Sequence, residues 1–160
     1  LLKLIQEEKN KLKSSINIAV KVAPDIEINN LDNIGNILLN YDVKFIIISN
    51  TSDGTRDRLK NINKFEKGGL SGKPLLDRSK ECISIAYKLI GRDIPIIGVG
   101  GISCLDDVLS YLNAGASAVQ LYTGLIYKGP KIASNINDEL AKYLISNKIS
   151  NISELVGINH

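Results

Sequence analysis

The sequence predicts an α/β fold, the C-terminal half of a (β/α)8 TIM barrel, in which four parallel strands alternate with helices. Three observations lead to this prediction. Short runs of β-branched residues are each followed by an amphipathic segment, as parallel strands and their crossover helices require. The first strand is followed by Ala23-Pro24-Asp25, where a doubly wound nucleotide-binding fold would carry a glycine fingerprint. Glycine-rich turns follow the last two strands, where (β/α)8 barrels place a phosphate site.

The predicted strands are nearly all apolar, which is typical of parallel strands that are covered on both faces. They span residues 16–23, 45–49, 94–98 and 118–121. The predicted helices span residues 28–40, 77–90, 105–113 and 131–146. A helical spacing of apolar residues also runs from Leu1 to Leu12 with no capping residue before it, so we expect an upstream segment.

The composition indicates one globular domain and argues against several functions. The 160 residues are 44% apolar and 23% charged, so we expect residues 1–160 to form a single, partial domain. The net charge is +3, but basic and acidic residues are interspersed, which argues against a nucleic-acid partner. Cys82 and Cys104 lack the spacing of a metal site, so no metal is expected. No apolar run could span a bilayer, and no targeting signal is visible.

One connection is much longer than the others. Residues 50–76 are polar and rich in glycine, whereas the loop between a strand and its helix usually has about 2 to 6 residues. Loops of this kind often carry function, so we expect an active-site loop. Within it, Gly68, Gly69, Ser71 and Gly72 would let backbone amides approach an anion, although a flexible surface turn is the alternative.

Polar side chains stand at the ends of the first two predicted strands. Lys21 lies near the end of an apolar strand, so its ammonium must either reach solvent or meet an anion such as the N1 edge of a reduced flavin. Ser49, Asn50 and Thr51 end the next strand. They could hydrogen-bond a planar, carboxylated heterocycle, although some polarity is expected wherever a strand enters a loop.

The two late glycine turns predict a phosphate cradle. One is Gly98-Val99-Gly100-Gly101, and the other is Tyr122-Thr123-Gly124. Asp106 and Asp107 open the helix after the first turn and would repel a phosphate if they faced it. We therefore expect them to cap that helix on its outer side.

Taken in order, these motifs resemble those of the class 2, quinone-using dihydroorotate dehydrogenases, and the likeness covers nearly the whole chain. The sequence departs from the family at Cys104 and Leu105, where a small residue and a glycine are common. The motifs that carry the resemblance are Val20-Lys21-Val22-Ala23-Pro24-Asp25, Ile48-Ser49-Asn50-Thr51, Gly68-Gly69-Leu70-Ser71-Gly72-Lys73-Pro74-Leu75, Pro95-Ile96-Ile97-Gly98-Val99-Gly100-Gly101-Ile102 and Gly115-Ala116-Ser117 through Gln120-Leu121-Tyr122-Thr123.

The resemblance implies an FMN-containing oxidoreductase of pyrimidine synthesis that converts dihydroorotate to orotate. It implies substrate contacts from Asn50 and Thr51. No catalytic residue is expected in this chain, because the family's catalytic serine lies on a loop before the first strand seen here. The residues implied to contact FMN are Lys21, Ser49, Ser71, Gly72, Gly100, Gly101, Tyr122 and Thr123.

The implied partners are dihydroorotate or orotate, a quinone, and the N-terminal half of the same barrel. Membrane association would come only through a segment upstream of this chain, at the mitochondrial inner membrane in a eukaryote. We therefore expect the chain to be a fragment or one half of a split enzyme. Two alternatives stay open: another phosphate-binding barrel enzyme acting on a sugar phosphate, and a non-catalytic half barrel that binds a phosphorylated ligand.

Overall fold

The computed structural model describes residues 1–54, 56–57 and 59–160, and it contains one parallel sheet with the strand order β1-β2-β3-β4. The strands are β1 (Ile18–Val22), β2 (Val43–Ile48), β3 (Ile96–Val99) and β4 (Ala118–Gln120). The helices that follow them are α2 (Ile28–Leu39), α3 (Leu76–Ile90), α4 (Leu105–Asn113), and α5 (Thr123–Lys128) with α6 (Ile132–Ser146). All four predicted strands and all four predicted helices are confirmed, with ends that differ by no more than two residues.

Several short elements were not predicted. They are α5 and three 3-10 helices, η1 (Ile62–Phe65), η2 (Lys73–Leu75) and η3 (Ile152–Leu155). Each is too short to display an apolar periodicity in the sequence. The helical spacing at the start of the chain forms α1 (Leu2–Lys11), which lies apart from the sheet and buries none of its residues.

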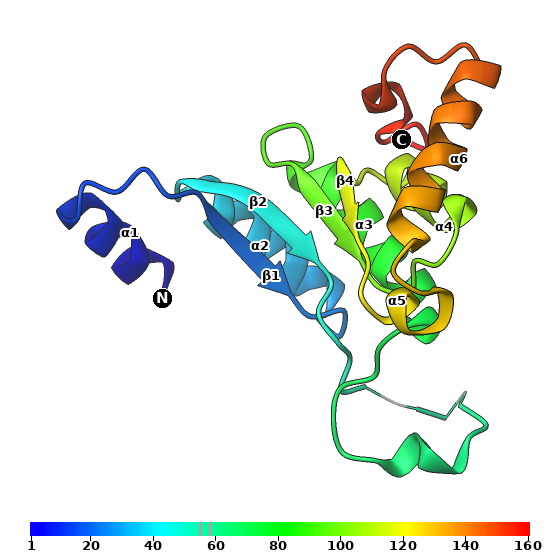
Figure 1. The fold of residues 1–160 in the computed structure, drawn as a ribbon. Coiled ribbons are helices and arrows are strands. Elements are labelled where there is room, and N and C mark those ends of the chain that lie inside the picture. The colour runs from blue at the N-terminus through cyan, green and yellow to red at the C-terminus, as the bar shows by residue number, and fades with distance from the viewer. Residues whose placement is uncertain (55, 58) are drawn as a thin grey trace.

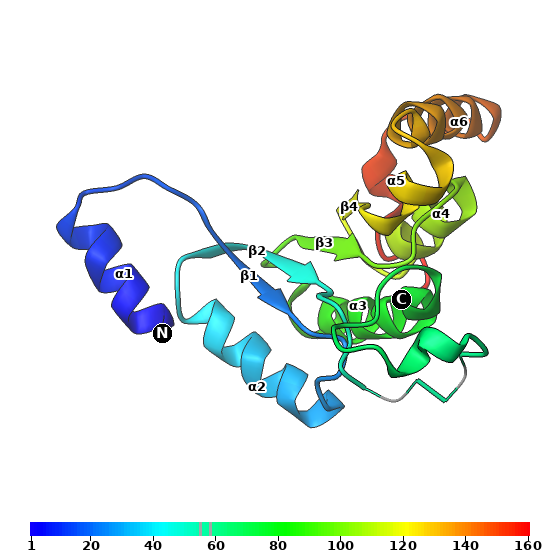
Figure 2. The same ribbon diagram turned by 60° about the horizontal axis from the view of Figure 1, so that its bottom comes forward.

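The helices after β1, β2 and β3 cover one face of the sheet (Figures 1 and 2). Between that face and α3 and α4 lies the core, in which Ile46, Ile48, Ile83, Ile96 and Tyr111 are almost completely buried. Burying one such isoleucine side chain contributes about 1.5 to 3 kcal/mol. Because side chains alternate along a strand, the residues between these buried positions face the opposite side of the sheet.

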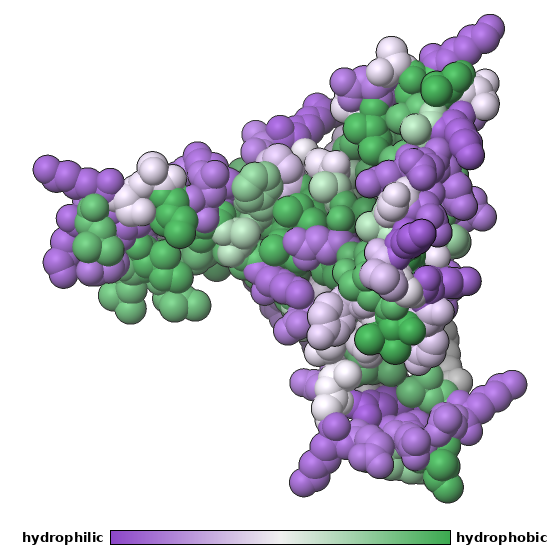
Figure 3. Space-filling view, viewed as in Figure 1, coloured by the Kyte–Doolittle hydropathy of each residue, from purple (hydrophilic) through white to green (hydrophobic). Residues whose placement is uncertain are grey.

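The opposite face of the sheet is open. Ala19 and Lys21 on β1 and Ala118 and Gln120 on β4 are exposed there, and Figure 3 shows hydrophobic surface, interrupted by some hydrophilic side chains, over the region of the sheet. In the part of the chain that the structure describes, β1 and β4 each pair with one neighbour only.

The long connection between β2 and α3 is closed at its base. Ser52 and Leu70 form an antiparallel bridge, with N–H to carbonyl distances of 3.0 and 2.7 Å. Farther out, the Arg56 guanidinium donates hydrogen bonds to the carbonyls of Lys64, Glu66 and Gly68. The tip of the loop therefore projects away from the sheet, while residues 50–51 and 71–72 are held beside the strand ends (Figure 1).

Candidate functional site

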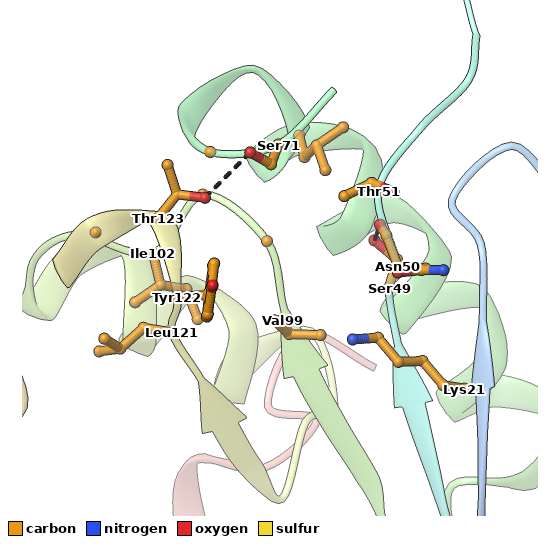
Figure 4. A pocket seen from close by; sticks show the side chains of 15 residues that line it. Lys21, Ser49, Asn50, Thr51, Ser71, Val99, Ile102, Leu121, Tyr122 and Thr123 are labelled. Atoms are coloured by element: carbon orange, nitrogen blue, oxygen red, sulfur yellow. Dashed lines mark hydrogen bonds between the residues drawn. The ribbon is translucent and has the colours of Figure 1, made fainter. Parts of the chain in front are cut away.

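A cavity of about 240 Å³, here called the main cavity, lies at the carboxyl ends of the four strands. In parallel α/β folds this edge of the sheet is where ligands bind. All ten residues that the resemblance implies for the cofactor and the substrate line the main cavity, and Figure 4 labels seven of them. The ten are Lys21, Ser49, Asn50, Thr51, Ser71, Gly72, Gly100, Gly101, Tyr122 and Thr123. The ligand that each one contacts stays a prediction.

Lys21 brings a cation into the main cavity. Val22 faces the helices and is buried, so the alternation along β1 places Lys21 on the open face of the sheet. Figure 4 shows its side chain extending across the end of β2 toward Val99. Among the described residues no carboxylate pairs with its ammonium, which leaves that charge available to an anionic group in the cavity.

The end of β2 is fixed by hydrogen bonds on both sides. The N–H of Ser49 donates to the carbonyl of Val99 at 2.8 Å, and the N–H of Asn50 donates to the carbonyl of Val22 at 2.8 Å. The hydroxyl of Ser49 is buried and lies 2.7 Å from the hydroxyl of Ser79. The side chains of Asn50 and Thr51 are exposed at the cavity, so their hydrogen-bonding groups are open to a ligand.

The glycine turns and the loop before α3 approach one another closely. Gly101 has a φ of +74°, and a Cβ there would lie 3.0 Å from the carbonyl oxygen of Gly72. Gly72 has a φ of +77°, and a Cβ there would lie 3.0 Å from the Cγ2 of Thr123. The hydroxyl of Thr123 donates to the Ser71 hydroxyl at 3.2 Å. Glycine is therefore required at both positions for conformation and for space.

These segments leave backbone donors available. Within the described part of the chain, no hydrogen bond is made by the backbone N–H groups of Gly101, Ile102, Thr123 and Gly124. A second cavity of about 410 Å³, here called the side cavity, adjoins them and also contains Lys73, Ser103, Tyr127 and Lys128. Its wall of Gly72, Gly101, Ile102, Thr123 and Gly124 is common to both cavities. We call these five shared residues the glycine wall. Its unpaired backbone amides fit a phosphate.

Comparison with known proteins agrees with this geometry. The family model described as dihydroorotate dehydrogenase matches residues 1–144. The chain belongs to the dihydroorotate dehydrogenase family. Its quinone-type relatives include those of Christiangramia forsetii, 42% identical over 88% of this chain, and Parvibaculum lavamentivorans, 36% identical over 91%. The mitochondrial enzyme of Mus musculus is 36% identical over the entire chain.

Solved structures of this family show the same architecture. The dihydroorotate dehydrogenase of Eimeria tenella in complex with ferulenol superposes with a TM-score of 0.91 and 32% sequence identity. It covers 99% of this chain, whereas this chain covers 47% of it. The chain spans about two fifths of the length of the curated dihydroorotate dehydrogenases that it matches. No described helix has both the length and the apolar character needed to cross a membrane.

The prediction about helix capping at the start of α4 is wrong. Asp106 and Asp107 were expected to cap α4 on its outer side. Asp106 is exposed as expected, but the residue before α4 is Cys104, and no side chain caps this helix. Asp107 is buried and turns inward, where its carboxylate binds the ammonium of Lys73 at 2.6 Å. No local pattern in the sequence indicates this pair, because its members are 34 residues apart.

Other supporting residues were also missed. Ser79 on α3 and Tyr111 on α4 lie completely buried beneath the site. Tyr111 donates a hydrogen bond to the carbonyl of Gly100, and Ser79 pairs with Ser49. Their positions in amphipathic helices indicate burial but cannot indicate a partner, because each partner lies in a different segment.

Proposed function

We propose that this chain is the part of a quinone-dependent dihydroorotate dehydrogenase that holds FMN and the dihydroorotate ring. The observation that carries the proposal is that one cavity gathers a free lysine, the Asn50-Thr51 pair and a glycine wall with unpaired amides. The lysine suits the electron-rich flavin ring, the Asn50-Thr51 pair suits the carboxylated substrate, and the unpaired amides suit the phosphate of such a complex.

The residues present fit FMN. The glycine wall, where side chains would collide at Gly72 and Gly101, would hold the phosphate through backbone N–H groups. Lys21 would lie against the flavin ring and stabilise negative charge on it. When bound, FMN supplies the capacity to accept two electrons from the substrate and pass them on to a quinone.

Asn50 and Thr51 would orient the substrate. Both side chains are exposed at the cavity, and the backbone that carries them is fixed by the bond from Asn50 to Val22. A carboxamide and a hydroxyl can hydrogen-bond a ring carbonyl, a ring N–H or a carboxylate. The general base that removes the substrate proton would come from outside this chain.

We also propose that the chain is completed by the N-terminal half of its barrel. The edges of β1 and β4 and the open sheet face support this proposal, since such edges invite pairing with further strands. The relatives are more than twice as long, which leaves room for that half. Quinone access and peripheral membrane association, mitochondrial in a eukaryote, would belong to the upstream part.

Spectroscopy of the full-length protein tests the function. The purified protein is expected to be yellow, and anaerobic addition of dihydroorotate should bleach the flavin band. A short-chain quinone should then restore the absorbance. A full-length protein that purifies colourless and takes up no added FMN would contradict the proposal.

Gel filtration tests the completion of the barrel. Residues 1–160 expressed alone should self-associate through the open edges, whereas co-expression with the upstream half should give one soluble species. A stable, native-like monomer of residues 1–160 would argue instead for an autonomous binding module.

A further inference from the structure

An ion pair joins the two sides of the glycine wall. Lys73 lies in η2, directly after Gly72, and Asp107 lies in the first turn of α4. The Nζ of Lys73 is 2.6 Å from the Oδ1 of Asp107. The side chain of Asp107 is 6% exposed and that of Lys73 is 61% exposed, so a buried carboxylate is met by an ammonium at the rim.

The second oxygen of the same carboxylate holds the glycine turn. The Oδ2 of Asp107 accepts hydrogen bonds from the N–H of Ser103 at 2.9 Å and from its hydroxyl at 3.0 Å. Ser103 closely follows Gly101 in the chain. One carboxylate therefore ties the loop that carries Gly72 to the turn that carries Gly101.

Both members of the pair are charged at neutral pH. Burial acts to raise the pKa of Asp107, but hydrogen bonds from Lys73 and Ser103 outweigh it and lower the pKa. The hydrogen bond to Asp107 raises the pKa of Lys73. The buried carboxylate therefore balances the charge of the ammonium within the protein.

We infer that the Lys73–Asp107 pair is a positioning clamp that fixes the spacing of the two glycine segments, so that their amides grip a phosphate. The inference rests on the proposed function, in which that phosphate belongs to FMN. Lys73 and Ser103 both line the side cavity next to Gly72 and Gly101, so the clamp lies where a change in spacing would open the wall.

Titration with two flavins tests the clamp. In the full-length apoprotein, Lys73→Met and Asp107→Asn should each weaken FMN binding about 10-fold, equivalent to roughly 1.4 kcal/mol. Riboflavin has no phosphate, and its affinity should stay within about twofold. The double variant should be no weaker than the weaker single variant, because either change releases the same clamp. Lys73→Arg should restore most of the FMN affinity.

A matched control removes an ion pair outside the wall. Lys80 and Asp77 form an exposed pair at 3.6 Å on α3, and Lys80→Met should leave both flavin affinities unchanged. If Asp107→Asn tightened FMN binding while Lys73→Met weakened it, Lys73 would bind phosphate directly and the clamp would be refuted. Equal losses for FMN and riboflavin would also refute it, since they would indicate a general structural role.

The proposed function can fail separately. If the wild-type protein bound neither flavin, the cofactor assignment would be wrong, and the clamp would be judged with inorganic phosphate. Phosphate should then raise the thermal unfolding midpoint of the wild type and of Lys80→Met, but not that of Lys73→Met or Asp107→Asn. Equal phosphate protection of all four proteins would overturn the clamp.

Discussion

The hydroxyl of Tyr111 donates a hydrogen bond of 2.5 Å to the carbonyl of Gly100. The same hydroxyl lies 3.3 Å from the carbonyl of Leu76, at the start of α3. Burial raises the pKa of Tyr111, so the phenol keeps its proton and remains a donor at neutral pH. The ring also fills the space beside Gly98, where a Cβ would lie 2.5 Å from the Cδ2 of Tyr111. The buried side chain of Tyr111 thus supports the turn at Gly98–Gly101 both by a hydrogen bond and by packing.

Removing this hydroxyl should destabilise the protein and loosen the turn. Tyr111→Phe keeps the ring but leaves the Gly100 carbonyl without its donor, which should cost about 1 to 3 kcal/mol of unfolding free energy. Urea denaturation of the full-length protein measures the cost. Tyr143→Phe is the control, because the Tyr143 hydroxyl makes no hydrogen bond within the described residues and its loss should cost less than about 0.5 kcal/mol. Equal costs would show that the Tyr111 hydroxyl contributes nothing.

The glycine wall should not tolerate a methyl group at Gly101. Gly101→Ala combines the left-handed conformation with contacts of 2.9 Å to the Cβ of Leu76 and 3.0 Å to the Gly72 carbonyl. We expect FMN affinity to fall at least about 10-fold. Gly129→Ala shares the positive φ but meets nothing within 4 Å, so it should cost only the conformational strain of about 1 to 3 kcal/mol and leave FMN affinity intact. Comparable FMN losses in the two variants would contradict a steric role for the wall.

Lys21 should affect the reaction more than the fold. Its exposed side chain has no charged partner among the described residues, so Lys21→Ala should change the unfolding free energy by less than about 0.5 kcal/mol. Anaerobic flavin reduction by dihydroorotate, followed by absorbance, should slow at least about 10-fold. Lys21→Arg, which keeps the cation, should lose less. Parallel loss of stability and reduction rate would indicate a structural lysine.

Acid should release the contact that connects α1 to the sheet. Lys44 and Lys9 both bind the carboxylate of Asp42 and lower its pKa from 3.8 to about 2. A carboxyl whose pKa is lower in the folded state stabilises that state above the pKa of the unfolded chain. The stabilisation is lost as the pH falls from about 4 toward 2.

Comparison with Asp42→Asn isolates this effect. The difference in unfolding free energy between the wild type and this variant should be constant above pH of about 5 and should shrink below about 4. High salt should reduce the difference as well, because Asp42 and Lys44 are exposed to solvent. A difference that is unchanged at low pH would show that Asp42 does not act through its charge.

Much of the fold follows from local patterns. The runs at 45–49 and 94–98 are apolar and β-branched because the strands they form are central in the sheet, and their identity as strands needs no tertiary information. The short helix α5 and the turn η2 could not be predicted in this way, because their conformations depend on packing against distant segments.

The candidate site could likewise be predicted only in part. Lys21, Asn50 and Gly101 could be found because each lies at the end of a strand, and the topology of a parallel sheet brings all strand ends to one edge. The pairing of Lys73 with Asp107 and of Ser49 with Ser79 depends on how α3 and α4 pack, which no local pattern encodes.

The bridge between Ser52 and Leu70 makes the outer part of the long loop independent of the cavity. Because the two chain segments are held together at this point, the part of the loop between Gly54 and Gly68 can vary in length, while Gly69 stays packed against Thr51. Lengthening such a closed loop adds little entropic cost, roughly 0.6 kcal/mol for each doubling. The tip is therefore a place where evolution, or an inserted affinity tag, can add sequence while the ligand-binding edge keeps its shape.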